Sequence, residues 1–335
     1  MPGNECRALM LRRDEGNLVA AVETVPVKEL PPSGEVLVRV EYSGLNYKDA
    51  MAIGDRGIIR NFPAVPGIDF AGVVEESGSP AWKPGDRVIA TGWGLGERYW
   101  GGLAGYARAK AEWLTRLPEG MSALTAMSLG TAGFTAMLCA QALARAGCEP
   151  GSGEVLVTGA SGGVGSVAVA VLAKRGYRVV AMSGKPEAAE RLTALGASRV
   201  VGRGEYATPS KPGRFVLEPE AFAGAVDTVG GATLASVIAR TAYGGAVAAC
   251  GLAGGAELDT HVFPFIVRGV SLLGIDSVRH PAALRPAVWE RLAVELDPAL
   301  IGSFTRIIAL EEAPAEAARI LSGGGDGRAV VKLGG

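Results

Sequence analysis

The sequence is poor in histidine and has almost no net charge. Its 335 residues include two histidines, and 33 Lys and Arg residues stand against 34 Asp and Glu residues, which gives a formal net charge of −1. Without a basic excess, the chain lacks the charge needed to neutralise nucleic-acid phosphates or to bind an anionic membrane surface. We therefore expect neither a nucleic acid nor a membrane as a partner.

The sequence also lacks C-x-x-C spacing, which would indicate a redox or zinc site. The first 14 residues carry charges and no apolar run, unlike a secretory signal. The apolar run that we single out, residues 166–173, is too short to span a bilayer. These features predict a cytoplasmic protein, in which disulfides are rare and buried thiols are expected. The cysteines are Cys6, Cys139, Cys148 and Cys250.

Short strand patterns dominate the first 120 residues. Residues 35–42, EVLVRVEY, alternate between apolar and polar side chains as a half-buried strand does. Similar short runs are separated by turns rich in Pro and Gly. Strand patterns return in the tail, which has no strand–helix partner left in the middle of the chain. We therefore assign residues 1–124 and 302–335 to one barrel-like β domain.

Strands and helices alternate in the middle of the chain, and we assign residues 125–301 to a second domain. Near-continuous apolar strands that alternate with helices are typical of a parallel, doubly wound sheet, and six strands is the number found in dinucleotide-binding domains. The fold class is therefore α/β. The six strands are predicted at residues 154–158, 178–182, 199–201, 225–229, 246–250 and 270–275.

A glycine-rich turn, residues 159–165 (GASGGVG), joins the first of these strands to a helix. It fits the pattern A-x-G-x-x-G, in which Gly162 lets the backbone approach a pyrophosphate and Gly165 lets the helix pack against its strand. Free N–H groups at the start of the helix bind the phosphates. The turn predicts a dinucleotide site, although a purely structural glycine turn is the alternative. The expected cofactor residues here are Ser161, Gly162, Gly163 and Val164.

The end of the second predicted strand favours NADPH over NADH. NAD sites usually place Asp or Glu there to bind the ribose 2′-hydroxyl, but no carboxylate occurs before Glu187. Ser183 can donate a hydrogen bond, and the two nearby cations can bind a 2′-phosphate. The alternative is that these cations are ordinary solvated loop residues. The expected cofactor residues here are Ser183, Gly184, Lys185 and Arg203.

The shortage of histidine argues against a catalytic zinc ion. Such a site needs about three His, Cys or carboxylate ligands, and His261 and His280 both occur late in the sequence, away from the predicted β domain. We therefore predict no metal ligand. Without a metal to polarise a carbonyl, hydride addition to an activated C=C bond is favoured over alcohol oxidation.

Five stretches carry a resemblance to known proteins: residues 45–49 (LNYKD), 61–63 (NFP), 66–72 (PGIDFAG), 130–136 (GTAGFTA) and 249–255 (ACGLAGG). Together they resemble the medium-chain dehydrogenase/reductase superfamily, and within it the zinc-free, NADPH-dependent quinone oxidoreductases of YhdH/YhfP type, which include acrylyl-CoA reductase. The resemblance covers essentially the whole chain. It implies a GroES-like β-barrel catalytic domain beside a Rossmann domain. Zinc-dependent relatives carry Gly-His-Glu where this chain has Gly67-Ile68-Asp69, and a Cys ligand near Asn46.

The resemblance also implies roles for individual residues. Asn46 and Asp69 are expected to line the active site beside the nicotinamide, and Tyr47 and Leu252 are expected to contact the cofactor. The Asn46 amide would donate to an enolate oxygen, and Asp69 would orient it or relay a proton. Tyr47, Asp69 or water would supply the proton. The alternatives are an Asx-turn for Asn46 and a turn carboxylate for Asp69.

The leading hypothesis is the reduction of a short 2-enoyl thioester, acrylyl-CoA to propanoyl-CoA, by hydride transfer to the β-carbon and protonation at the α-carbon. A quinone or small enone is the alternative acceptor, and an NADPH-binding protein without turnover is a third hypothesis. Lys48, Arg56 and Arg60 are a candidate rim for the CoA phosphates, or simply solvated charges. By analogy with the family, residues 270–275 at a sheet edge are expected to form a homodimer.

Overall fold

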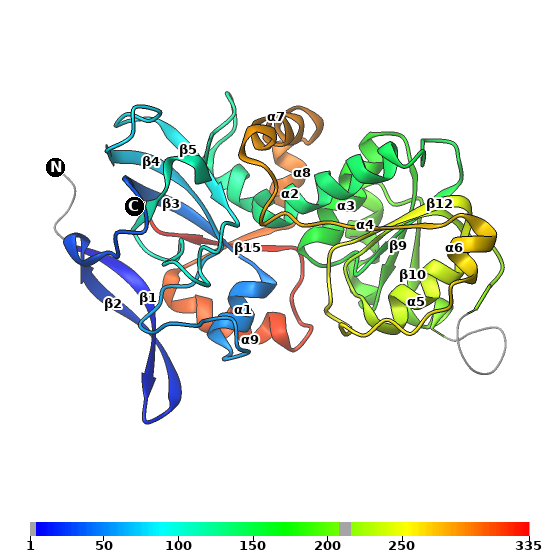
Figure 1. Cartoon of the computed structure of the whole chain (residues 1–335), viewed down its shortest axis with the longest axis horizontal. Coiled ribbons are helices and arrows are strands. Elements are labelled where there is room, and N and C mark those ends of the chain that lie inside the picture. Colours follow the sequence, from blue (N-terminus) through cyan, green and yellow to red (C-terminus); the bar gives the residue numbers. More distant parts are fainter. Residues whose placement is uncertain (1–4, 208–215, 335) are drawn as a thin grey trace. The chain divides into compact units, whose positions relative to one another are not determined.

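The computed structural model describes residues 5–207 and 216–334, and its elements are labelled in Figure 1. The chain divides into two units. Of the described residues, 5–131 and 277–334 form the first unit, and Ala132–Asp276 forms the second. Each unit is described by itself below.

The first unit includes residues 277–301, which the sequence assigned to the domain 125–301. Arg285 explains their place, because its buried guanidinium donates to the backbone oxygen of Thr91 at 2.8 Å and to those of Ser277 and Val278 at 3.0 and 2.9 Å. These bonds hold the segment against the end of strand β5. The boundaries 1–124, 302–335 and 125–301 stay a prediction for the functional domains.

A seven-stranded sheet organises the first unit. Its order is β14-β15-β3-β4-β5-β7, and β6 also pairs with β3. Val36, Val38 and Val40 alternate along β3 and are fully buried in one hydrophobic cluster, as the EVLVRVEY pattern predicted. The tail strands β14 and β15 join this sheet. The strands are β3 (Val36–Leu45), β4 (Asp69–Ser77), β5 (Arg87–Thr91), β6 (Tyr106–Ala109), β7 (Leu114–Arg116), β14 (Thr305–Ile308) and β15 (Arg328–Lys332).

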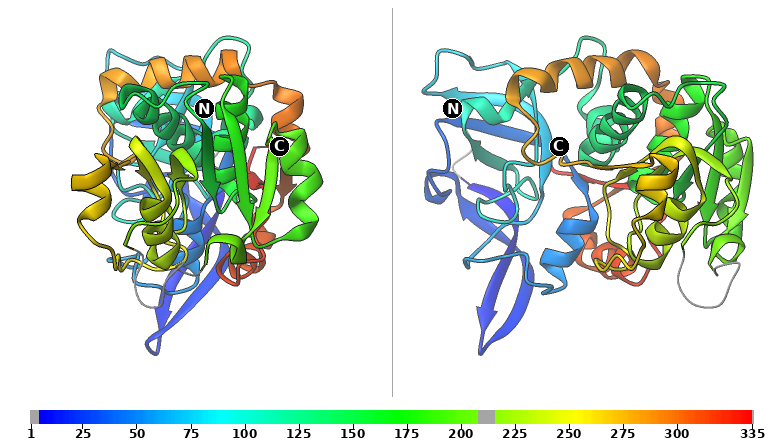
Figure 2. Two further views of the ribbon diagram at one scale, coloured as in Figure 1. Left: turned by 90° about the vertical axis from the view of Figure 1, so that its right-hand side faces the viewer. Right: turned by 45° about the vertical axis from the view of Figure 1, so that its right-hand side comes forward.

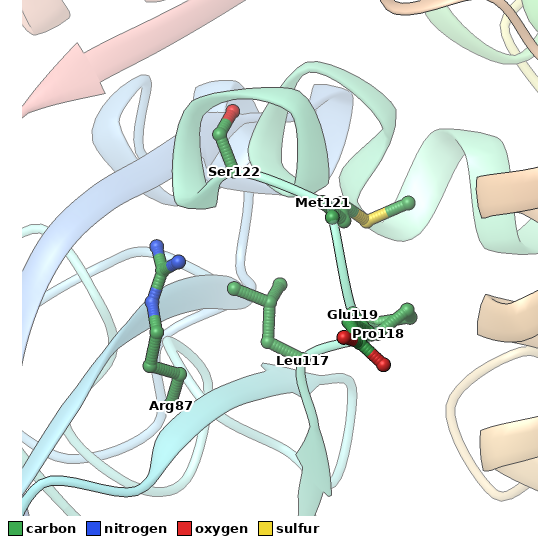
Figure 3. Close-up of a pocket in the computed structure, with 7 residues that line it drawn as sticks. Arg87, Leu117, Pro118, Glu119, Met121 and Ser122 are labelled. Carbon is green, nitrogen blue, oxygen red and sulfur yellow. The ribbon is translucent and has the colours of Figure 1, made fainter.

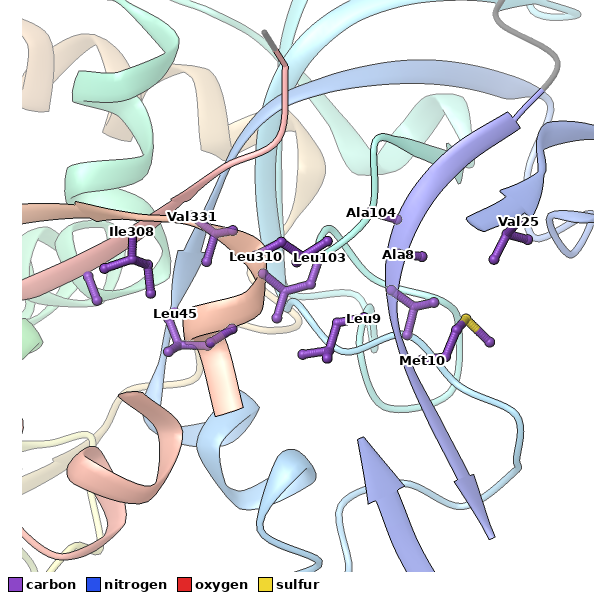
Figure 4. Packing of buried hydrophobic residues seen from close by; sticks show 13 residues of the cluster. Ala8, Leu9, Met10, Val25, Leu45, Leu103, Ala104, Ile308, Leu310 and Val331 are labelled. Atoms are coloured by element: carbon purple, nitrogen blue, oxygen red, sulfur yellow. The ribbon is translucent and has the colours of Figure 1, made fainter. Parts of the chain in front are cut away.

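A hairpin of β1 (Glu5–Asp14) and β2 (Asn17–Pro26) extends from this sheet in Figure 1. Its first strand contributes Leu9 and Met10 to a core shared with Leu45 of β3 and Val331 of β15, shown in Figure 4. The first and last strands of the unit therefore share one core. The helices of the unit are α1 (Tyr47–Ile53), the first part of α2 (Ala123–Arg145), α7 (Arg285–Glu295), α8 (Pro298–Ser303) and α9 (Ala313–Leu321).

The longest apolar helix is α2, and not the run at residues 166–173 that the sequence analysis singled out. It is 23 residues long and apolar enough to cross a membrane by length and composition, but 83% of its most apolar window is buried inside the protein. A buried core helix passes the same test. The helix is also interrupted at Gly130, whose φ of 52° and ψ of −151° are not helical.

A six-stranded sheet forms the centre of the second unit, with the order β10-β9-β8-β11-β12-β13. All five pairings are parallel. This order is that of a doubly wound dinucleotide-binding domain, so the predicted fold class is confirmed. Helices lie on both sides of the sheet in Figure 2. The strands are β8 (Glu154–Thr158), β9 (Arg178–Ser183), β10 (Arg199–Gly202), β11 (Phe222–Asp227), β12 (Thr241–Ala249) and β13 (Ser271–Gly274).

The helices of the second unit follow its strands as predicted. Strand β8 leads into α3 (Gly163–Lys174), and β9 leads through a short 3-10 turn into α4 (Ala189–Ala194). Two further helices, α5 (Gly231–Arg240) and α6 (Phe263–Arg268), precede the last two strands. The sheet's core is apolar on both strands and helices, with Leu156, Val180, Ala225, Val237 and Val247 in one cluster.

Candidate functional site

The register between β3 and β15 brings two distant polar residues together. Leu45 pairs with Ala329 in an antiparallel ladder, so the next residue along, Asn46, lies opposite Arg328. The guanidinium of Arg328 donates from Nη1 to Oδ1 of Asn46 at 3.0 Å. Arg328 is 4% exposed. The sequence interpretation missed this residue; the only available signal was an arginine directly before the buried strand pattern of the tail.

Asn46 and Asp69 lie together, as the sequence resemblance implied. Nδ2 of Asn46 donates to Oδ2 of Asp69 at 2.9 Å, and the same nitrogen lies 3.2 Å from Oδ2 of Asp49 and 3.3 Å from the Gly44 oxygen. Both amide protons of Asn46 therefore have acceptors within the protein. Donation from this amide to an enolate oxygen stays a prediction, and the contacts give Asn46 a positioning role in the network.

Asp69 is fully buried at the start of β4 and accepts hydrogen bonds at both oxygens. Oδ1 accepts from the Gly44 N–H at 2.9 Å, and Oδ2 accepts from the Thr131 N–H at 2.7 Å in addition to Asn46. Charge-assisted bonds of this kind hold a carboxylate in one orientation. Asp69 therefore resembles a fixed structural anion more than a mobile proton relay.

Asp49 is a second buried carboxylate in this network. Oδ2 accepts from the Asn46 N–H at 2.8 Å, at the start of α1, and Oδ1 accepts from the Gly67 and Ile68 N–H groups, both at 2.9 Å. Burial, followed by the nearby charge of Asp69, raises the pKa of Asp49 to about 7, although its hydrogen bonds act in the opposite direction. The network can thus gain or lose a proton near neutral pH.

The kink at Gly130 makes room for this arrangement. A Cβ atom on Gly130 would lie 2.7 Å from Nη2 of Arg328 and 2.7 Å from Oδ2 of Asp69. A Cβ atom on Gly44 would lie 2.6 Å from the same nitrogen and 2.8 Å from Oδ1 of Asp69. A side chain at either position, one at the interruption of α2 and one in β3, would displace the guanidinium or the carboxylate.

Tyr47 and Lys48 follow Asn46 at the start of α1. Tyr47 is 42% exposed, so its phenol is accessible to a ligand. Lys48 forms an ion pair with Glu97 at 2.7 Å, which weakens its candidacy as a phosphate contact. Arg56 and Arg60, the other members of the candidate CoA rim, are exposed.

The glycine turn of the second unit has the geometry that its pattern predicted. Gly165 packs so closely that a Cβ atom there would lie 2.3 Å from the Gly159 oxygen and 2.7 Å from the Ala160 Cα. Gly162 has more room, since its Cβ atom would meet only the Gly159 oxygen, at 3.3 Å. Gly163 and Val164 begin α3, so their N–H groups lie at a helix N-terminus, where anions bind favourably.

The residues expected at the adenosine end of the cofactor also lie close together. Ser183 donates to the Ser161 hydroxyl at 3.0 Å and accepts from the Lys185 N–H at 3.1 Å. A Cβ atom on Gly184 would lie 2.2 Å from Nε of Arg203, so the guanidinium lies against this glycine. These five residues surround the end of β9, where a 2′-phosphate is predicted to bind.

Arg191 of α4 is a further cation at this turn that the sequence interpretation missed. It donates to the Ser166 hydroxyl at 3.1 Å and to the Ser161 oxygen at 3.4 Å. Leu252 follows β12 and is 55% exposed. Three residues later in the same loop, Gly255 forms an isolated β-bridge with Gly230. The contact of Leu252 with the cofactor stays a prediction.

Two cavities of the first unit lie away from these residues. One, of ≈ 400 Å³, is lined by Arg87 and by the segment from Leu117 to Ser122, as Figure 3 shows. The other, of ≈ 390 Å³, lies beside Cys6 and Lys332. Neither cavity is lined by a predicted site residue.

Within residues 5–207 and 216–334, no group of three His, Cys, Asp or Glu side chains could hold a metal ion.

Comparison with known proteins decides the family. Residues 32–119 match the alcohol dehydrogenase GroES-like domain, and residues 163–294 match the domain described as zinc-binding dehydrogenase. The chain is 52% identical to the Escherichia coli protein named "Probable acrylyl-CoA reductase AcuI", over 98% of this chain and 99% of that one. The chain belongs to the zinc-free YhdH/YhfP group of the medium-chain dehydrogenase/reductase superfamily.

Two other relatives cover the whole chain. Acrylyl-CoA reductase AcuI of Ruegeria pomeroyi is 51% identical over 97% of this chain and 98% of its own. YhfP of Bacillus subtilis, which carries the name of a quinone oxidoreductase, is 46% identical over 98% of both chains. The family therefore includes relatives named for either acceptor.

Solved structures of the family superpose closely on this chain. The yhdH oxidoreductase of Salmonella enterica, in complex with NADP, has a TM-score of 0.94 at 50% identity and covers 98% of this chain and all of its own. The yhfP protein of Bacillus subtilis, with NAD bound, has a TM-score of 0.93 at 45% identity, covering 99% of this chain and all of its own. The GroES-like and Rossmann architecture is thus established.

Proposed function

We propose that this protein reduces the C=C bond of a short 2-enoyl thioester, acrylyl-CoA to propanoyl-CoA, with NADPH as the reductant. One observation carries the proposal: the chain is 51% identical, over 97% of its length, to a relative named acrylyl-CoA reductase. Asn46 and Asp69 lie in one buried network at α1 and β4, and Tyr47, the residue after Asn46, is partly exposed at the start of α1.

The end of β9 supports NADPH as the cofactor. Ser183, Lys185 and Arg203 provide one hydroxyl and two cations there, where an NAD site would usually have a carboxylate. A relative at 50% identity binds NADP, whereas another at 45% identity has NAD bound. We attribute the preference of this chain for NADPH to these three side chains.

Once bound, NADPH supplies a hydride, which adds to the β-carbon of the enoyl group. Negative charge then develops on the thioester oxygen, and the α-carbon takes up a proton. Tyr47 is our candidate donor of this proton. Its phenol is accessible, and in the chain Tyr47 follows Asn46, whose side chain is held by hydrogen bonds. Asn46 and Asp69 act by holding the start of α1 in place. A Tyr47→Phe variant should retain NADPH binding and lose turnover.

Steady-state NADPH oxidation tests this proposal. Acrylyl-CoA, crotonyl-CoA and a benzoquinone are compared as acceptors under identical conditions. We expect the highest kcat/KM with acrylyl-CoA. A kcat/KM at least about tenfold higher for the quinone, equivalent to about 1.4 kcal/mol in transition-state binding, would overturn the proposal in favour of a quinone or enone reductase.

A quinone acceptor is the second candidate because one full-length relative carries that name. The same scaffold would then deliver hydride to a quinone, and Arg56 and Arg60 would have no phosphate to bind. Replacing both by Ala separates the two functions: KM for the acyl-CoA should rise while KM for the quinone stays constant. A protein that binds NADPH but oxidises it with none of the acceptors would have a purely binding role.

The edge of the second unit's sheet supports a homodimer. Strand β13 ends the strand order, and the preceding helix α6 with its N-cap exposes Val262, Ile266 and Val267 to extents of 63%, 70% and 53%. We propose that a second copy of the chain pairs with this edge and covers these side chains. An Ile266→Glu variant should shift the protein to monomers in sedimentation analysis.

We also propose that the protein is cytoplasmic, and cell fractionation tests this.

A further inference from the structure

We propose that Arg328 is a positioning residue for the reduction, acting through Asn46 on the start of α1. This proposal deepens the proposed function and rests on it. The buried guanidinium of Arg328 fixes the orientation of the Asn46 amide. It also supplies the positive charge that allows the carboxylates of Asp49 and Asp69 to be buried.

The contacts of Arg328 leave it one orientation. Nε donates to the Ser128 oxygen at 2.9 Å, Nη2 donates to the Met127 oxygen at 3.2 Å, and Nη1 donates to Oδ1 of Asn46. All three nitrogens of the guanidinium are thus engaged, by a helix and by a loop residue. A planar fork of this kind cannot be reproduced by a lysine, which presents one nitrogen.

The hydrogen bond from Arg328 decides which way the Asn46 amide points. Because Nη1 donates to Oδ1, the amide nitrogen must face the carboxylates of Asp69 and Asp49. The backbone N–H of Asn46 is also bound to Asp49, and Tyr47 is the next residue and the first of α1. Arg328 therefore determines the position from which Tyr47 projects.

The charges of the network favour the same interpretation. Asp49 on α1 and Asp69 on β4 are both fully buried, and the guanidinium of β15 is the cation whose attraction acts on both. Burial lowers the pKa of Arg328 from its ordinary value, and the two carboxylates oppose that shift. Removing the cation would leave two buried carboxylates without a balancing positive charge, which favours protonation of Asp49.

The test compares Arg328→Lys and Arg328→Met with Arg285→Lys in the full-length protein. Arg285 is a matched control, because it is 1% exposed and binds backbone oxygens but makes no contact with Asn46. We expect kcat to fall roughly 10- to 100-fold in the Arg328 variants, with KM for NADPH changed less than threefold. The acidic limb of the kcat profile should move to higher pH by about one unit. Arg285→Lys should lower the melting temperature and leave both kinetic readouts unchanged.

An Arg328→Lys variant with wild-type kcat and an unshifted pH profile would overturn the proposal. If Arg328→Met fails to fold, the double variant Arg328→Met with Asp49→Asn removes one charge of each sign and should fold; its failure to fold would also count against the charge argument. Infrared spectra of the carboxyl groups in the wild type and Arg328→Lys need no substrate. An increase in protonated carboxyl at pH 7 supports the network even if acrylyl-CoA proves not to be the acceptor, so the two proposals can fail separately.

Discussion

The backbone N–H of Thr131 donates to Oδ2 of Asp69 at 2.7 Å, immediately after the interruption of α2 at Gly130. On the other side of the interruption, the Met127 and Ser128 oxygens accept from Arg328. A carboxylate thus faces the start of one helical segment and a guanidinium faces the end of the other, which is the favourable placement for both charges. The kink in α2 and the buried charges stabilise each other.

Gly130→Ala should destabilise the first unit. The glycine has a φ of 52° and a ψ of −151°, and a Cβ atom would overlap both Arg328 and Asp69. We expect a loss of at least about 2 kcal/mol in the free energy of unfolding, measured in urea. Gly302→Ala is the control, because Gly302 lies in helix α8 and a Cβ atom there would meet no other atom within 4 Å. An equal loss in both variants would contradict this explanation of the kink.

Asp49 should make the protein less stable as pH rises toward neutrality. Its pKa is raised from 3.8 to about 7 in the folded protein. Between roughly pH 4 and 7 the folded protein therefore keeps a proton that the unfolded chain has released, so the contribution of Asp49 to the free energy of unfolding falls across this range and is constant above it. Urea titrations at pH 5, 6, 7 and 8 should show a smaller decline for Asp49→Asn. Parallel curves for the two proteins would refute the shift.

Gly162 and Gly165 should fail in different ways when changed to Ala. The Cβ atom of Gly165→Ala would overlap the Gly159 oxygen, so this variant should lose stability. Gly162→Ala has only a tight contact and should fold, but its methyl group faces the expected pyrophosphate. We expect NADPH affinity, measured by fluorescence titration, to fall at least about tenfold in Gly162→Ala. Unchanged NADPH affinity in a folded Gly162→Ala protein would remove the pyrophosphate from this turn.

Lys185 and Arg203 should distinguish NADPH from NADH. Loss of a charge-assisted contact with the 2′-phosphate costs about 1.5 to 3 kcal/mol, so Lys185→Ala or Arg203→Ala should raise KM for NADPH at least about tenfold and leave KM for NADH nearly constant. Arg178→Ala serves as the control because Arg178 lies at the other end of β9 and pairs with Glu154. Equal effects of Lys185→Ala on both nucleotides would place Lys185 outside the 2′-phosphate site.

The sequence predicted those parts of the fold that local patterns determine. Strand β8 has the predicted bounds, Glu154–Thr158, because an apolar run ends there at a glycine turn. Helices α7 and α8 were not predicted: their mixed sequences lack a clear apolar stripe. The placement of residues 277–301 depends on Arg285 and on tertiary contacts that no local pattern reveals.

The candidate site was predicted in part. Motifs identified Asn46, Tyr47 and Asp69, and the structure brings the first and last of them into contact. The role of Arg328 required the register between β3 and β15, which joins residues 282 positions apart. The hydrogen bonds of the Asn46 amide likewise follow only from three-dimensional contacts, so the sequence could not predict them.

The distance along the chain between Asn46 and Arg328 has a consequence for synthesis. At roughly 5–20 residues per second, a ribosome needs on the order of 15–60 s to add the 282 residues that follow Asn46 up to and including Arg328. During that time Asp49 and Asp69 have left the ribosome while the arginine that balances their charge does not yet exist. The first unit therefore cannot reach its final packing while it is being translated, and a ribosome stalled before residue 328 should display it in a loosened, protease-sensitive form.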